Sequence, residues 1–88
     1  MATLEEGMAR YNDDQYEAAY EILLPLAKDG NDEAQFFIGL MYYRGEHVEH
    51  DVEQAAYWFK RSANQHNVDA ANMLMECDCT TTKHTNRF

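Results

Sequence analysis

The sequence predicts an all-α fold, a right-handed superhelical array of antiparallel helical hairpins (an α-solenoid) with about five helices. Two pairs of segments repeat in register at an offset of 36 residues, 16–19 with 52–55 and 31–34 with 67–70. Residues 7–11 repeat at 39–43 with an offset of 32, so the second unit holds four additional residues between its halves. A period in this range, in helix-forming sequence, is typical of stacked helical hairpins.

Capping residues place the first two predicted helices. The first spans about 3–11 and the second about 15–28. Thr3 precedes Glu6, and Asp14 precedes Glu17, at the spacing of a capping box, in which an N-cap side chain accepts a hydrogen bond from the amide three residues later. Gly30 then offers the left-handed residue that commonly ends a helix.

The third to fifth helices follow by the same signals. Asn31 is an N-cap candidate for a helix over about 32–43, whose second half carries no charged residue and is therefore expected to be surrounded by other elements. Gly45 ends it and opens a longer loop. Asp51 begins a fourth helix that runs to about Gln65, and Asn67 begins a fifth over about 68–77. We expect one repeat domain at 1–78, with a complete unit at about 31–66, and a flexible tail at 79–88.

The charge of the chain narrows the class of partner. Net charge is −9, and residues 1–33 hold nine acidic residues against Arg10 and Lys28, which leaves −7 in that part. Such a balance disfavours nucleic acid and anionic membrane, because both require a basic surface. The acidic surface either attracts a basic partner or simply keeps the protein soluble. No apolar run approaches the roughly 20 residues of a membrane span. The start has no secretory signal and there are only two cysteines, so we expect a cytoplasmic protein.

The residues of the central unit resemble a known family, the Sel-one-like repeats, which are tetratricopeptide-like helical hairpins. The resemblance rests on small, aromatic and glycine positions, namely Asn31 to Gln35, Ile38 to Tyr43, Gly45, Val48, Asp51, Gln54 to Ala56, Trp58, Phe59, Ser62 and Ala63. His66 and Met75 stand where the family usually has glycine. The resemblance implies an adaptor or scaffold that binds another protein.

The resemblance also implies a binding face, since the first arm of each tetratricopeptide-like hairpin lines the concave side. One stripe of the first arms, hereafter the first-arm stripe, is predicted to form a groove with an apolar floor and an acidic rim. Its residues are Leu4, Met8, Tyr11, Glu33, Phe36, Leu40, Tyr43, Asp69, Asn72 and Glu76. Such a groove suits a basic or amphipathic segment of a protein or peptide. The alternative is that these side chains pack between repeats and leave no groove.

A second predicted surface is the last helix, where no following hairpin covers Met73 and Leu74. Uncovered apolar surface at the end of an array favours assembly, so a homodimer or a self-assembling subunit is the alternative to an adaptor.

Catalytic and metal-site interpretations find little support. Cys77, Cys79 and His84 lack a fourth ligand and the spacing of structural zinc, and a cysteine–histidine nucleophile also needs an orienting group. His47 and His50 could chelate a divalent ion, but a solvated loop is the favoured interpretation because nothing would hold the ligands in place. We therefore expect no catalytic residues, no metal, no cofactor and no enzymatic activity.

Overall fold

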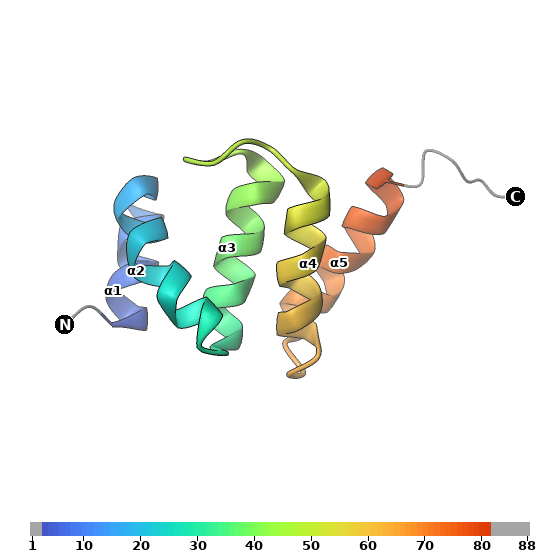
Figure 1. The fold of residues 1–88 in the computed structure, drawn as a ribbon, viewed down its shortest axis with the longest axis horizontal. Coiled ribbons are helices and arrows are strands. Elements are labelled where there is room, and N and C mark those ends of the chain that lie inside the picture. The colour runs from blue at the N-terminus through green and yellow to red at the C-terminus, as the bar shows by residue number, and fades with distance from the viewer. Residues whose placement is uncertain (1–2, 82–88) are drawn as a thin grey trace, which may run out of the picture.

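The computed structural model describes residues 3–81, and it places side chains as far as Cys77. All secondary structure in this range is helical (Figure 1), as the sequence predicts. The helices are α1 (Leu4–Asn12), α2 (Tyr16–Lys28), α3 (Asp32–Arg44), α4 (Val52–Ala63) and α5 (Val68–Thr81). Within residues 3–81, no helix combines the length and the apolar character needed to cross a membrane.

The helices pack mainly against their neighbours in the chain. α1 packs on α2, α2 on α3, α3 on α4 and α4 on α5, and α5 also touches α3. The two hairpins are therefore α1–α2 and α3–α4, and α5 follows them at one end of the row (Figure 1). The array places the apolar α3 in the middle.

Four of the five predicted N-caps are confirmed. In each, a side-chain oxygen accepts a hydrogen bond from the backbone amide three residues later, at 2.9 to 3.2 Å. These caps are Thr3, Asn31, Asp51 and Asn67. They satisfy amides that a helix start leaves without an intrahelical partner, so each helix begins within one residue of its predicted start.

The predicted cap at Asp14 is wrong. Asp14 has a positive φ of 63° and α2 begins after Gln15, whose side chain makes no capping hydrogen bond. The Asp14 carboxylate instead accepts a hydrogen bond from the Tyr16 hydroxyl at 2.9 Å. The turn between α1 and α2 is so tight that Asp14 takes the left-handed conformation, which asparagine and aspartate tolerate better than most residues.

Glycines set the distance between the arms of each hairpin. A Cβ atom added to Gly7 would lie 2.6 Å from Cδ2 of Leu23, and one added to Gly39 would lie 2.6 Å from Cε1 of Phe59. Both distances are shorter than real contacts, so the large side chain of the second arm occupies space that only glycine leaves free in the first arm. The two pairs occupy corresponding places in the two hairpins.

A buried amide ties the two hairpins together. Gln35 of α3 is almost fully buried, and its Nε2 donates a hydrogen bond to the Ala27 carbonyl oxygen at 2.9 Å. Its Oε1 accepts from Nε2 of Gln65 at 3.0 Å. Because a buried amide without partners is costly, these bonds fix the end of α2 against α3 and the segment after α4.

The fifth helix is longer than expected. It continues to Thr81, four residues beyond the predicted end at Cys77. Residues 82–88 of the predicted tail lie outside the described residues.

Candidate protein-interaction site

The first-arm stripe follows α1, α3 and α5, but its residues differ widely in exposure. In α1, Leu4 and Met8 are half-buried, whereas Tyr11 is only 8% exposed. In α3, Leu40 is only 6% exposed. Tyr11 and Leu40 belong to the hydrophobic core, and they leave little surface for a partner.

Two aromatic residues of the stripe lie beside the glycine contact of the central hairpin. The ring centroids of Phe36 and Tyr43 lie 5.9 and 6.4 Å from that of Phe59. Both side chains remain half-buried, so each packs on Phe59 with one part and reaches solvent with another. Aromatic pairs at these distances attract each other through their ring quadrupoles. Phe36 and Tyr43 therefore present a rigid apolar surface.

Acidic and polar residues flank this aromatic surface. Glu33 lies in the first turn of α3 and is exposed. Asp69, Asn72 and Glu76 of α5 are exposed as well. The stripe therefore combines half-buried aromatic side chains of α3 with exposed polar and acidic side chains of α3 and α5, two helices that are in contact.

Tyr11 holds the end of α1 against the second hairpin. Its ring centroid lies 5.1 Å from that of Phe37 and 5.3 Å from that of Tyr16. Its hydroxyl donates to Oε1 of Glu46 at 2.7 Å and accepts from Nη1 of Arg44 at 3.1 Å. Burial, reinforced by the hydrogen bond to Glu46, raises the pKa of the Tyr11 phenol above its ordinary value. Tyr11 is thus a junction between hairpins.

The loop at residues 45–51 supplies part of this junction. It leaves α3 at Gly45, whose φ is 70°, and reaches over the α1–α2 hairpin before it returns to α4 (Figure 1). The ring centroid of His47 lies 5.2 Å from that of Tyr20 on α2, and the Tyr20 and Tyr42 hydroxyls are 3.4 Å apart. Sequence reasoning missed these contacts, because the residues involved are 22 to 35 positions apart.

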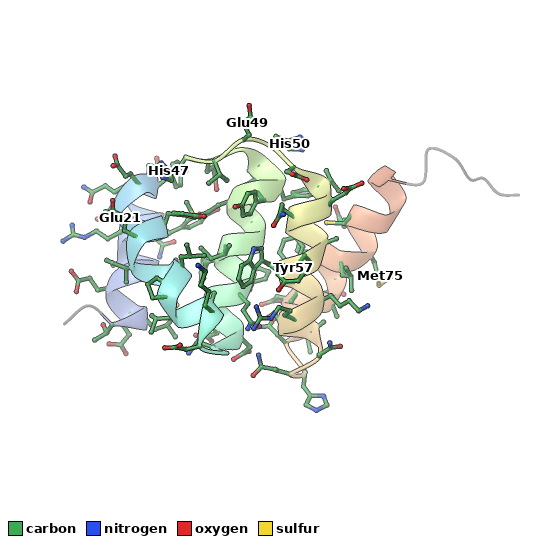
Figure 2. The ribbon with its side chains drawn as sticks, in the orientation of Figure 1. Glu21, His47, Glu49, His50, Tyr57 and Met75 are labelled. Atoms are coloured by element: carbon green, nitrogen blue, oxygen red, sulfur yellow. The ribbon has the colours of Figure 1, made fainter. Side chains whose placement is uncertain are left out.

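The face of α5 that sequence reasoning proposed for assembly is partly covered. Met73 and Leu74 are half-buried and pack against the core. The most exposed apolar side chains of α5 among the described residues are Val68, at 71%, and Met75, at 65% (Figure 2). Met75 occupies the position of Gly7 and Gly39 in the repeat. The offset of 36 residues from Gly39 could have identified Met75 as an uncovered apolar residue of α5.

The residues considered for chemistry do not gather into a site. Among the described residues, no group of three histidine, cysteine or acidic side chains is close enough to share a metal. Cys77 is buried, and the side chains of Cys79 and His84 lie outside the described part of the chain. His47 and His50 are exposed in the loop (Figure 2). Ser62 is buried and donates to the Asp32 carbonyl oxygen at 2.7 Å, which is a structural role.

The α3–α4 hairpin corresponds to a known repeat. It contains the contact of Gly39 with Phe59 and the left-handed Gly45, and Asn31 and Asn67 cap the helices at its two boundaries. Residues 32–67 match the family model of the Sel1 repeat. This segment is similar to a Sel1 repeat. It starts at the first residue of α3 and ends at the cap of α5, so the matched range is one complete hairpin with its loop. The family is the one that the sequence resembles.

The match to the Sel1 repeat covers residues 32–67 of the 88 residues and indicates the type of domain. Sel1 repeats form helical-repeat domains that mediate protein–protein interaction. No curated protein and no solved structure was found to match the chain.

Proposed function

We propose that this chain is a small adaptor that binds a basic or amphipathic segment of a partner protein through the first-arm stripe. The observation that carries the proposal is the half-buried pair Phe36 and Tyr43, held on Phe59, in a stripe whose Glu33 and Asp69 are exposed. Aromatic residues with rigid rings are preferred anchors in protein interfaces, and a polar rim confers specificity. The acidic net charge of −9 favours the approach of a basic partner.

The domain and its compartment complete the proposal. We take residues 1–78 as one repeat domain, since α1 to α5 form an unbroken row of packed helices. We place the domain in the cytoplasm, because two cysteines are too few for a disulfide scaffold and this fits a reducing compartment.

The test compares two charge-reversed proteins, both altered only at exposed positions. Glu33→Lys with Asp69→Lys reverses the rim of the stripe, and Glu17→Lys with Glu21→Lys makes the same change of charge on α2. Immobilised proteins capture binders from a native lysate. A basic protein retained by the unmodified chain and by the α2 variant, but not by the stripe variant, supports the proposal. Equal loss from both variants would show unspecific charge attraction and refute it.

A second experiment tests the aromatic floor. Phe36→Glu with Tyr43→Glu should abolish capture, while Val68→Glu, which also puts a carboxylate in place of an apolar side chain but at an exposed position of α5, should not. Circular dichroism must first show an unchanged helical signal, because Phe36 and Tyr43 also support Phe59. Capture that survives the double substitution would remove these two residues from the site.

Self-assembly through α5 is the second candidate function, and exposed Met75 is the observation that favours it. At the corresponding positions Gly7 and Gly39 receive the second arm of their hairpin, whereas α5 has no second arm among the described residues. Sedimentation velocity across a range of concentrations tests this. A dimer that dissociates on Met75→Glu supports it, and a monomer at every concentration excludes it.

A further inference from the structure

We propose that the outward face of α4 is a second docking surface, which binds an acidic segment of a partner polypeptide. A carboxylate of the partner would lie on the guanidinium of Arg61, and an apolar side chain would cover the ring of Tyr57. This surface belongs to a second arm, so the proposal does not depend on the first-arm stripe. We call it the α4 patch: it consists of exposed Tyr57 and Lys60 and half-buried Arg61, and it rests on Trp58, which is only 6% exposed and belongs to the core.

The geometry of the α4 patch holds the guanidinium in place. Cζ of Arg61 lies 5.1 Å from the ring centroid of Trp58 and 5.7 Å from that of Tyr57, and the two rings are packed edge to face. Nη1 of Arg61 also lies 3.4 Å from the Tyr57 hydroxyl. Spacings of three and four residues bring side chains onto one face of a helix. Aromatic rings therefore order Arg61 before any partner binds.

Among the side chains that the structure places, no carboxylate forms an ion pair with this guanidinium. In the part of the chain whose side chains are placed, the only ion pair joins Arg10 to Glu6. Lys60 and Arg61 are the only residues between Gln54 and Val68 that carry a formal charge, so this stretch of α4 is positive in a chain of net charge −9. Glu53 precedes Arg61 by eight residues, about 12 Å along the helix, which exceeds the screening length of about 8 Å at physiological salt.

The repeat itself does not require the pair of Tyr57 and Arg61. At the offset of 36 residues, the corresponding positions of the first hairpin are Glu21 and Pro25, and both are exposed. Figure 2 shows Glu21 on α2 and Tyr57 on α4. The α1–α2 hairpin folds without an aromatic or a cation there. Tyr57 remains 53% exposed, so about half of this side chain is available to a partner.

The chemistry of the α4 patch selects a carboxylate. An arginine guanidinium presents planar donors that match the two oxygens of a carboxylate. Nη1 of Arg61 donates to the Tyr57 hydroxyl, and the guanidinium has further N–H groups that a partner can bind. Tyrosine, tryptophan and arginine are also the residues that contribute most to binding in protein interfaces. An acidic segment with interspersed apolar residues complements both the cation and the exposed tyrosine ring.

The test is a binding titration with a defined probe. A labelled ten-residue peptide of alternating glutamate and leucine is titrated with the full chain, and binding is followed by fluorescence anisotropy. Arg61→Gln should weaken binding about tenfold and Tyr57→Ala about threefold. The matched control is Lys28→Gln, which removes the same charge from the last turn of α2, and it should change binding less than twofold. If Arg61→Gln loses its helical signal, Arg61→Lys replaces it, with an expected loss of about threefold, because lysine lacks the planar donors.

Three results would overturn the proposal. The first is the absence of saturable binding of the glutamate peptide to the unmodified chain. The second is an equal effect of Arg61→Gln and Lys28→Gln, which would assign binding to overall charge. The third is equal binding of a peptide with glutamine in place of glutamate, which would assign the α4 patch to apolar ligands. Tighter binding of a ten-nucleotide thymidine strand would overturn it as well, because that result would assign the α4 patch to nucleic acid.

Discussion

The ring of Phe59 lies where the side chain of residue 39 would be if that residue were not glycine. A Cβ at Gly39 would meet Cε1 of Phe59 at 2.6 Å. Phe36 and Tyr43 enclose the same ring from α3. The closeness of α3 and α4 and the position of the proposed aromatic floor therefore depend on a single missing methyl group.

Gly39→Ala should destabilise the protein by about 1 to 3 kcal/mol, because the added methyl group overpacks a buried ring. Urea unfolding followed by circular dichroism measures the change. Met75→Ala, at the corresponding but exposed position of α5, should alter stability by less than about 0.5 kcal/mol. In a Phe59→Leu background, Gly39→Ala should lower the free energy of unfolding by a smaller amount, because the ring that the methyl group meets is gone. An equal loss in both backgrounds would show that the ring of Phe59 is not the cause.

Tyr11→Phe should lower the free energy of unfolding by about 1 to 2 kcal/mol. The substitution keeps the ring but removes the donor to Glu46 and the acceptor for Arg44, which leaves a part-buried carboxylate without this partner. Tyr16→Phe removes an exposed hydrogen bond to Asp14 and serves as the control, with a smaller expected loss. Equal urea midpoints for Tyr11→Phe and the unmodified chain would contradict the importance of the junction.

Alkaline pH should destabilise the fold. Burial raises the pKa of Tyr20 to about 12, a hydrogen bond to Asp14 raises that of Tyr16 to about 12, and the pKa of Tyr11 is also raised. The unfolded chain releases these protons near pH 10, whereas the folded chain keeps them longer. Their contribution is therefore complete below about pH 10 and is lost as the pH rises from 10 towards 12. Urea midpoints at pH 9 and pH 11 measure it, and midpoints that do not fall would contradict it.

His66→Gly should stabilise the protein by about 0.5 to 1 kcal/mol. His66 has a φ of 74° after α4, in a conformation that costs a side chain steric strain and costs glycine none. Thermal unfolding should show a higher midpoint for glycine, whereas His66→Ala retains the strain and should not gain. An equal rise of the unfolding midpoint for His66→Ala would show that removal of the imidazole, and not relief of backbone strain, stabilises the protein.

The local features of the fold could be predicted because their causes lie within a few residues. Thr3, Asn31, Asp51 and Asn67 bond to amides three residues away, so the sequence displays both partners. Asp14 has the same spacing but is wrong as a cap, since the tight turn between two packed helices determines its conformation. Here the contact between α1 and α2 overrides the local signal.

The candidate site was harder to predict, because exposure depends on packing between hairpins. Leu40 and Tyr11 have the same helical spacing as Phe36 and Tyr43, yet they are buried in the core. The contact of Tyr11 with Glu46 spans 35 residues and arises only when the loop folds back over the first hairpin. A periodic pattern identifies the face of a helix, but it does not show which residues of that face a neighbouring hairpin covers.

The four additional residues of the second unit bear on how the array opens. In a simple row of repeats each unit touches only the next, and a terminal helix such as α1 can fray independently of the others. Here the loop after α3 carries Glu46 to Tyr11 and His47 to Tyr20, so α1 and α2 cannot separate from the centre without releasing that loop. Hydrogen exchange in α1 should therefore report the same cooperative opening as α3, and the insertion makes one unfolding unit of two hairpins.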